Sequence, residues 1–248
     1  GNDDDTLYAL GDTSWLNGGT GNDYLVAVGN YNGVDSGDGN DFVVSIGNFA
    51  DVNTGKNQDV VSVFGNSSTI NTGEEDDLLR LMGHQSHLLA GSGNDFIWTD
   101  AQARNNVVDM SDGNDVIILG GNGNIFTGGA GVDTFVINDA IVNAQISDIN
   151  QQDQLVFADM SFEQIWFAKN NTDLVIHLDN ERSSTLTVAD YFNQENRADI
   201  VVSSFTDATT HQVKQEVLTV EAVDKLIQVM ASYDISNSEE SFMSGVST

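Results

Sequence analysis

The stretch that decides the fold is Gly19-Thr20-Gly21-Asn22-Asp23-Tyr24-Leu25-Val26, which returns one repeat later as Gly37-Asp38-Gly39-Asn40-Asp41-Phe42-Val43-Val44. When the chain is aligned on the Asp that ends this turn, it repeats at positions 5, 23, 41, 59, 77, 95, 115 and 133. The spacing is constant except for a slightly longer step from 95 to 115. A fixed period of this length indicates a solenoid in which each repeat forms one coil.

The Gly-rich turn is not equally preserved in every repeat. It recurs as Gly91-Ser92-Gly93-Asn94-Asp95 and Gly129-Ala130-Gly131-Val132-Asp133, while Ser111-Asp112-Gly113-Asn114-Asp115 lacks only the first glycine. Two turns are eroded and keep only the first glycine and the final Asp: Gly55-Lys56-Asn57-Gln58-Asp59 and Gly73-Glu74-Glu75-Asp76-Asp77. Glycine is favoured where the backbone takes left-handed angles. Because the two eroded turns lie in the middle of the repeat region, the turn pattern is strongest towards its two ends.

Each repeat predicts two short strands joined by two turns. A β-rich apolar run follows each Asp, and a second turn then opens with Gly and Asn, as in Gly29-Asn30 and Gly47-Asn48. The second strand carries one apolar residue at a fixed place: Leu16, Val34, Val52, Ile70, Leu88 and Phe126. Side-chain alternation places a further row in the core: Leu25, Val43, Val61, Leu79, Ile97 and Ile117. The expected fold is therefore all-β, a parallel β-roll (β-solenoid) with 18-residue coils.

The composition restricts the partners of this chain. It has 248 residues, with 8 Lys and Arg against 38 Asp and Glu, so its formal charge is -30. Such a charge repels nucleic acids and anionic membrane surfaces and attracts cations. The chain has no Cys, which excludes disulfides and thiolate zinc sites. It also has no run of about 18 apolar residues, so no transmembrane segment is predicted.

The turns resemble the nonapeptide Gly-Gly-x-Gly-x-Asp-x-U-x, where U is a large aliphatic residue, of the repeats-in-toxin (RTX) family. The resemblance covers residues 1–139 strongly and implies a calcium-binding β-roll in a secreted protein. The 18-residue period with one degenerate turn per coil is most similar to the C-terminal repeats of the multifunctional-autoprocessing RTX toxins. A large RTX adhesin is the close alternative.

Oxygen-rich turns of this kind suit calcium, a hard cation that takes about six to eight oxygen ligands. The glycines let carbonyl oxygens bend towards one point, and the Asp adds a carboxylate. Because one turn supplies too few oxygens, several ions are expected between the turns of successive coils, as the resemblance also implies. The alternative is ordinary turn chemistry, in which Asp only favours tight turns. The predicted metal-binding residues are Gly19, Gly21, Asp23, Gly37, Gly39, Asp41, Asp59, Asp77, Gly91, Gly93, Asp95, Gly113, Asp115, Gly129, Gly131 and Asp133.

The two eroded turns make the middle sites the least well defined in sequence. Their additional acids, Glu74, Glu75 and Asp76, either compensate for the lost glycines or face solvent. The second turns carry no matching Asp, so calcium is expected along one edge of the solenoid only. On the other edge, asparagines at 30, 48, 66 and 122 are placed to form a hydrogen-bonded ladder. His84 takes the asparagine place in its coil, and we interpret His84 and His87 as surface residues.

The outward-facing side chains of the first strands are unusually apolar. They are Tyr24, Val26, Phe42, Val44, Val60, Leu78, Phe96, Trp98, Val116 and Ile118. One hypothesis is that the C-terminal segment, another domain or a partner covers them, since exposed patches of this size usually mark contacts. The alternative is plain strand propensity.

After residue 139 the period ends and a different pattern begins. Residues 140–232 predict a β-rich capping segment with a hairpin around 166–178, a capping box at Ser161-Phe162-Glu163-Gln164, a short helical turn at 189–192 and a helical stripe over 221–232. A cap is expected because the open end of a solenoid exposes strand edges and core; an independent ligand-binding domain is the alternative. Residues 233–248 resemble the uncleaved type I secretion signal of the RTX family.

The predicted function follows from the resemblance and the charge. At low calcium the carboxylates repel one another, so the repeats are expected to stay unfolded for export through the type I secretion machinery. Extracellular calcium then folds them and assists export of a large toxin. The alternative is the tip of an adhesin that binds a host glycan or receptor. An enzyme is not predicted, because neither His-Glu-x-x-His nor Gly-x-Ser-x-Gly occurs.

Overall fold

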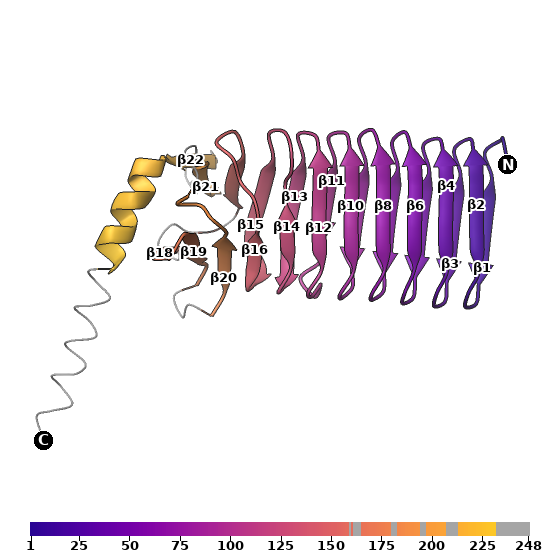
Figure 1. Cartoon of the computed structure of the whole chain (residues 1–248), viewed down its shortest axis with the longest axis horizontal. Coiled ribbons are helices and arrows are strands. Elements are labelled where there is room, and N and C mark those ends of the chain that lie inside the picture. Colours follow the sequence, from indigo (N-terminus) through magenta and orange to yellow (C-terminus); the bar gives the residue numbers. More distant parts are fainter. Residues whose placement is uncertain (159, 161–164, 180–182, 194–196, 207–212, 232–248) are drawn as a thin grey trace, which may run out of the picture.

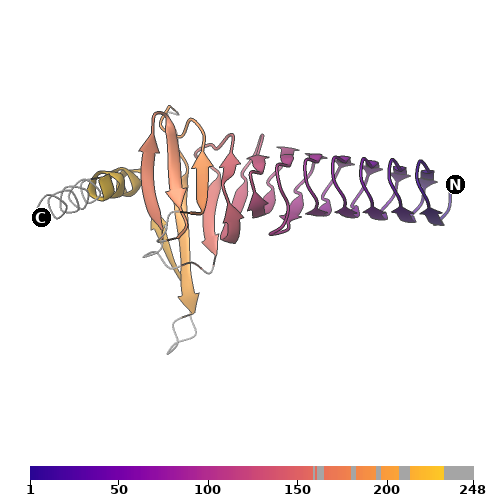
Figure 2. The same ribbon diagram turned by 90° about the horizontal axis from the view of Figure 1, so that it is seen from below.

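The structure is a computed structural model, and it describes residues 1–158, 160, 165–179, 183–193, 197–206 and 213–231. Two long β-sheets face each other along the whole repeat region, with the N-terminus at one end and a C-terminal region at the other that is wider than the roll in the second view (Figures 1 and 2). Each coil of the repeat region gives one strand to each sheet. The predicted all-β solenoid is confirmed.

The strands alternate between the two sheets along the chain. The first sheet contains, in spatial order, β1 (Thr6–Leu10), β3 (Tyr24–Val28), β5 (Phe42–Ile46), β7 (Val60–Phe64), β9 (Leu78–Met82), β11 (Phe96–Thr99), β13 (Val116–Asn122), β15 (Thr134–Val142), β17 (Gln154–Ala158), β21 (Asp199–Thr206) and β22 (Val213–Leu218). The second sheet contains β2 (Trp15–Thr20), β4 (Gly33–Asp38), β6 (Asp51–Lys56), β8 (Thr69–Glu74), β10 (His87–Ser92), β12 (Val107–Asp112), β14 (Ile125–Thr127), β16 (Ala144–Ile146), β20 (Thr185–Val188), β19 (Asp173–His177) and β18 (Trp166–Asn170).

The strand register follows the sequence period. Leu25 pairs with Val43, and Val43 pairs with Val61 in the next coil, so equivalent residues of successive repeats lie side by side. The single longer step preserves the same register, since Ile97 pairs with Ile117. Its two additional residues lie in the longer loop between β11 and β12, so the insertion leaves the sheets undisturbed.

The core is a single thin layer between the sheets. The predicted inward row of the first sheet is at most 1% exposed in every coil from Leu25 to Ile117, and the fixed apolar residue of the second sheet is buried as well. Val108 occupies that same place in the coil for which the sequence pattern names no residue. Full burial of one such side chain contributes about 2 kcal/mol, so stability accumulates coil by coil and is lowest at an uncovered end.

The C-terminal region ends both sheets with antiparallel strands. β17 and β21 extend the first sheet in parallel, and β22 then pairs antiparallel with β21. In the second sheet, β20 pairs parallel with β16, and the hairpin of β18 and β19 continues it antiparallel. The predicted hairpin is confirmed. Because both sheets run continuously through residue 139, the division into a roll (1–139) and a cap (140–232) stays a prediction based on the sequence period.

One helix, over residues 220–231, lies beyond β22 (Figure 1). Val223 buries its side chain in the core, and the Arg197 guanidinium binds the Asp224 carboxylate through two hydrogen bonds of 2.9 and 2.8 Å. Tyr191 is fully buried and donates its hydroxyl proton to the Ala198 carbonyl oxygen at 2.9 Å. These contacts fix the helix to the end of the sheets.

Four predictions about the C-terminal region have other outcomes. Residues 189–193 form hydrogen-bonded turns, so the short helix expected there is wrong; Asp190 takes a left-handed φ of 52° that a helix does not allow. The capping box at 161–164 and the tail at 233–248 lie outside the described residues. The described part of the C-terminal segment does not cover the outer face of the first sheet, because its strands extend the two sheets at their end (Figures 1 and 2).

Candidate calcium-binding edge

A row of aspartates lines one edge of the solenoid, at the turns that lead from the second sheet back to the first. Each Asp accepts, through Oδ1, a hydrogen bond from the backbone N–H of the Asp one coil earlier. For example, Asp23 N donates to Asp41 Oδ1 at 2.8 Å. Bonds of 2.7 to 3.0 Å continue this row without interruption through Asp5, Asp23, Asp41, Asp59, Asp77, Asp95, Asp115, Asp133 and Asp153.

The other carboxylate oxygen of these residues is buried without a partner. This holds for Oδ2 of Asp23, Asp41, Asp59, Asp77, Asp95, Asp115 and Asp133. Nearby hydroxyls lie close enough to lower the pKa of the carboxyls beside them, but they do not supply the missing partner, because Ser36, Thr54 and Thr72 each donate their proton to a backbone carbonyl at 2.8 to 3.0 Å. An unpaired anionic oxygen costs several kcal/mol when it is buried. Each coil therefore presents one position that favours a proton or a cation.

The turn glycines bring the backbones of successive coils into close contact. Gly37 has a φ of 107° and Gly39 a φ of 145°. A Cβ on Gly37 would lie 2.0 Å from the Gly19 carbonyl oxygen, and a Cβ on Gly39 would lie 1.9 Å from the Gly21 carbonyl oxygen. The stacked turns thus combine crowded carbonyl oxygens with one carboxylate per coil, which is the ligand chemistry that calcium prefers.

The close contact at Gly39 predicts a specific destabilisation. Gly39→Ala is expected to lower the melting temperature in calcium by roughly 5–10 °C, because the added methyl collides with the Gly21 carbonyl oxygen in addition to straining the backbone. Gly11→Ala is the matched control: Gly11 has a similar φ of 140°, but nothing lies within 4 Å of its Cβ position. Differential scanning calorimetry compares the two variants. Equal melting temperatures would show that only φ strain matters.

The eroded turns keep a positive φ at the place of the second glycine, although its value is smaller than the 118° and 145° of Gly21 and Gly39. Asn57 and Glu75 occupy the place of the second glycine with φ values of 73° and 72°, in the left-handed region. Asp59 and Asp77 remain in the row with hydrogen bonds of 2.8 Å. The Glu75 carboxylate accepts the Asn57 N–H at 2.7 Å. This acid therefore closes the neighbouring turn, so the middle of the row is geometrically intact.

The remaining two additional acids behave differently from each other. Asp76 accepts two hydrogen bonds from Asn94, at 2.6 Å from the backbone N–H and 3.1 Å from Nδ2, while Glu74 is exposed. Neither side chain reaches the buried Oδ2 row through a hydrogen bond described in the structure.

Burial raises the pKa of seven aspartates in the row, from Asp41 to Asp153. Desolvation lifts the pKa of Asp59 to about 8, of Asp77 and Asp115 to about 7, and of Asp95 and Asp133 to about 6. The hydrogen bond from the preceding Asp opposes the rise, and repulsion between neighbouring carboxylates adds to it. The pKa is raised for the same reason at Asp41 and Asp153. Near neutral pH, the row without metal therefore contains both protonated aspartates and charged aspartates that repel one another.

The donor set distinguishes among metals. Within the described part of the chain, no three acidic or histidine side chains converge on one point. A bound ion would thus rely on few carboxylates and on backbone carbonyl oxygens. Calcium tolerates such flexible, all-oxygen coordination, whereas zinc favours sets that contain nitrogen or sulfur ligands and magnesium demands a nearly ideal octahedron. The residues fit calcium.

The structure extends the row beyond the sequence prediction. The period is predicted to stop near residue 140, yet Asp153 accepts the Asp133 N–H at 3.0 Å and Leu155 pairs with Phe135. Asp148 accepts the N–H groups of Gly128 and Gly129, at 2.8 and 3.0 Å. Two signals for this coil are present in the sequence: the Asp-x-U pattern at 153–155, and a step from Asp133 to Asp153 that is as long as the step from 95 to 115. They are easily missed because the turn before Asp153 contains no glycine.

The opposite edge carries an asparagine ladder, as predicted. Asn48 donates its backbone N–H and its Nδ2 to Asn30 Oδ1, at 3.0 Å each, and Asn66 does the same with Asn48, at 3.1 and 2.9 Å. His84 follows in the row and donates its N–H to Asn66 Oδ1 at 2.9 Å. Arg104 comes next along this edge, so the predicted continuation to Asn122 does not join the ladder directly.

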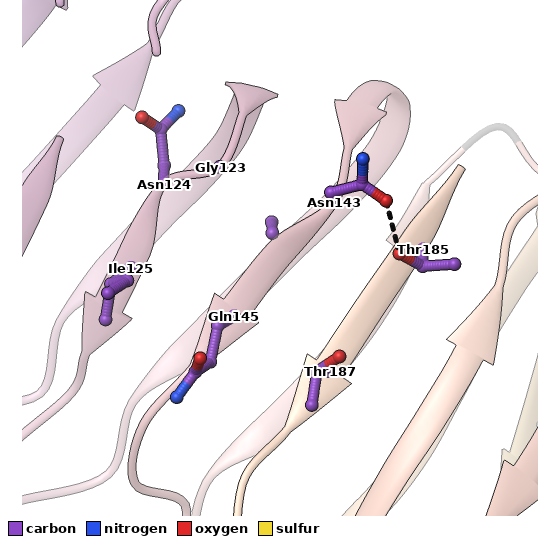
Figure 3. Close-up of a pocket in the computed structure, with 8 residues that line it drawn as sticks. Gly123, Asn124, Ile125, Asn143, Gln145, Thr185 and Thr187 are labelled. Atoms are coloured by element: carbon purple, nitrogen blue, oxygen red, sulfur yellow. Dashed lines mark hydrogen bonds between the residues drawn. The ribbon is translucent and has the colours of Figure 1, made fainter. Parts of the chain in front are cut away.

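A polar hollow of about 270 Å³ lies where the repeats meet the C-terminal strands (Figure 3). Its polar lining comes from Asn124 and Asn143, which directly precede β14 and β16, and from Gln145 of β16 and Thr185 and Thr187 of β20. The Thr185 hydroxyl donates to Asn143 Oδ1 at 2.8 Å across 42 residues of sequence. No acidic residue lines it, so it is separate in chemistry from the aspartate edge.

The fold and this edge define a class: a parallel β-roll with stacked, oxygen-rich turns. No family model matches the chain. Two curated proteins do, both named multifunctional-autoprocessing repeats-in-toxin. The one from Vibrio vulnificus is 31% identical over 131 residues, and the one from Vibrio cholerae serotype O1 (strain ATCC 39315 / El Tor Inaba N16961) is 30% identical over 123 residues. The matches cover 48% and 45% of this chain but only 2% and 3% of the toxins.

A solved structure resembles the roll. It is a hyperactive, Ca²⁺-dependent, β-helical antifreeze protein from an Antarctic bacterium, with a TM-score of 0.53 and 27% sequence identity. The similarity covers 62% of this chain and 52% of that one. The resemblance of this chain to the RTX proteins is therefore confirmed in sequence and in fold. Among the described residues, no helix is long and apolar enough to cross a membrane.

Proposed function

We propose that this chain is a calcium-operated folding module of a secreted protein. The observation that carries the proposal is the row of buried Oδ2 atoms without partners, one in each coil from Asp23 to Asp133. The residues that would hold the ions are the turn aspartates and glycines named from the sequence, with Asp153 added at the C-terminal end. Calcium, when bound, neutralises the row and supplies the missing partner of each Oδ2.

The negative charge of the turn aspartates makes folding of the module depend on calcium. At low calcium, folding would bring deprotonated aspartates of successive coils together and remove their water, so the coils do not form. The chain then stays in the extended state that a type I secretion channel requires. At extracellular calcium the free energy of binding becomes free energy of folding. A folded roll outside the cell cannot slide back and so assists export of the parent protein. The similarity to repeats of large secreted toxins supports this role, and no catalytic role is proposed.

Calcium removal tests the proposal directly. With excess EGTA at pH 8, the far-UV circular dichroism spectrum is expected to lose most of its β signal, because the aspartates are then charged and unpaired. Added calcium restores the signal, while the same concentration of magnesium restores much less of it. Equilibrium dialysis counts the ions. A chelated chain with unchanged β content would contradict the proposal.

The adhesin alternative remains a second proposal with weaker support. It would use the exposed aromatic side chains of the first sheet to bind a host glycan. Tyr24 and Phe42, however, stack on each other with ring centroids 5.2 Å apart and planes at 8°. Their ring faces are turned towards each other along the solenoid, which leaves mainly ring edges for a sugar.

A further inference from the structure

A second polar hollow, of about 280 Å³, lies on the edge of the roll that carries the asparagine ladder. Its lining comes from the turn after β7, from the end of β9 and the turn that follows it, and from the loop between β11 and β12. We call it the ladder-edge hollow. It is on the opposite edge from the aspartate row, so calcium binding does not account for it.

The insertion in the repeat builds one wall of the ladder-edge hollow. The loop between β11 and β12 holds the two additional residues of the step from 95 to 115. It is attached to the preceding coil at both ends, since Asp100 N donates to the Leu81 carbonyl oxygen at 3.0 Å and Arg104 N donates to that of Gly83 at 3.2 Å. Ala103 is fully buried beneath it. Insertions in repeat proteins lie on one face, often the face that binds a ligand.

Asp100 gives the hollow a carboxylate with unused acceptor capacity. Its Oδ1 accepts the Gln102 N–H at 3.0 Å, while its Oδ2 lies 3.7 Å from the Arg80 guanidinium, which is longer than a hydrogen bond. The Gln102 side chain is exposed and lines the same hollow, and its amide can both donate and accept. Because Arg80 balances the charge of Asp100, this wall is close to neutral.

His84 stands in the hollow where the ladder has asparagine in the preceding coils. Its backbone N–H continues the ladder to Asn66, but its ring Nδ1 is buried and has no hydrogen-bond partner in the described structure. The same is true of Nε of Arg80, the ion-pair partner of Asp100. Unpaired buried polar atoms are rare in folded proteins and mark places where strain, water or a ligand is to be expected.

We propose that the ladder-edge hollow binds an uncharged, hydroxyl-rich molecule of the size of one sugar ring. A carboxylate accepts hydrogen bonds from two neighbouring hydroxyls, and an amide donates and accepts, so Asp100 and Gln102 together suit a polyol. Met82 adds an apolar surface for the C–H side of a ring. The volume of about 280 Å³ is at the small end of sites for small molecules.

The charges near the hollow distinguish this ligand from ions. The formal charge of -30 disfavours an anion, and Arg80 beside Asp100 disfavours a cation. Within the described part of the chain, no three acidic or histidine side chains converge as a metal site requires. This binding function is additional to calcium-dependent folding and needs only a folded roll. It does not use the stacked aromatic rings of the first sheet.

NMR spectroscopy of the full chain in calcium tests the proposal. The probes are the methyl glycosides of glucose, galactose, mannose and N-acetylglucosamine. At least one is expected to shift the amide signals of Gly83, His84 and Gln102, with a dissociation constant on the order of millimolar, as is usual for a ligand of this size. N-acetylneuraminic acid, an anionic sugar, should not shift them. Tighter binding of an oligosaccharide that ends in the same sugar would assign the site to a glycan, and equal binding would assign it to the free sugar.

Two variants and a matched control connect binding to the hollow. Asp100→Asn is expected to weaken binding about tenfold, because hydrogen bonds to a charged acceptor are the stronger ones, and Gln102→Ala about threefold. Asp51→Asn makes the same change at an exposed acid of β6, outside the hollow, and should bind like the wild type.

Circular dichroism of each sample in calcium and in EGTA separates loss of binding from failure of calcium-dependent folding. If Asp100→Asn does not fold, Gln102→Ala decides the matter. A folded wild type that responds to none of the four glycosides would overturn the proposal. So would signal shifts confined to the other hollow, around Thr185, or a folded Asp100→Asn variant that binds like the wild type.

Discussion

At pH 5 and without calcium, the chain is expected to have more β structure and a higher melting temperature than at pH 8. Five aspartates of the row have pKa values of about 6 to 8 in the folded chain, against 3.8 without burial. Between these values the folded state holds protons that the unfolded state has released, so the free energy of unfolding falls as pH rises. This stabilisation is fully present below pH 3.8 and is lost as the pH passes about 8.

The measurement is thermal unfolding followed by circular dichroism in EGTA from pH 5 to pH 8. Light scattering must accompany it, because the sequence pI of about 4.1 favours association at lower pH. Acid and calcium act on the same oxygens, so calcium should raise the melting temperature much more at pH 8 than at pH 5. A metal-free chain that becomes more stable with rising pH would contradict the assignment of these carboxylates as buried and unpaired.

Replacing Asp59, Asp77 and Asp115 together by asparagine is expected to let the roll fold at pH 8 without calcium. Asparagine keeps the Oδ1 acceptor of the row and replaces the charged Oδ2 by a neutral amide. The pKa difference at Asp59 would correspond to more, but the new amide is itself buried without a partner, so we expect about 2 kcal/mol per site. The same variant should bind fewer calcium ions in equilibrium dialysis.

The control for this variant removes the same charge from the surface. Asp3, Asp51 and Asp112 lie at or near the surface, and their joint replacement by asparagine changes the net charge equally without touching a buried oxygen. This control should still need calcium for folding. If both triple variants folded without calcium, general repulsion in an acidic chain would explain the switch, and the individual Oδ2 sites would not.

The repeat period was sufficient to predict the coil, the core rows and the acidic edge. This worked because a solenoid contact is local in the period: each residue meets its equivalent one coil away, as Leu25 meets Val43. Sequence reasoning failed where the pattern is carried by backbone conformation. The row continues through Asp153, and Asn57 and Glu75 take left-handed angles without being glycine. Asparagine tolerates that conformation but glutamate disfavours it, so at Glu75 the stacked neighbouring turns impose an angle that the residue type does not predict.

The sequence by itself determined that this chain is a β-roll with oxygen-rich turns on one edge and an apolar outer strand face, since hydrophobic alternation and turn chemistry act within one coil. Only the tertiary structure decided that each Asp uses one oxygen for the next coil and leaves the other buried without a partner. It also decided that the described C-terminal strands extend the sheets and leave the outer face of the first sheet uncovered. Both outcomes depend on how the coils stack in space. Which oxygen finds a hydrogen-bond partner, and which surface another segment covers, is decided by neighbouring parts of the fold that the repeat period does not specify.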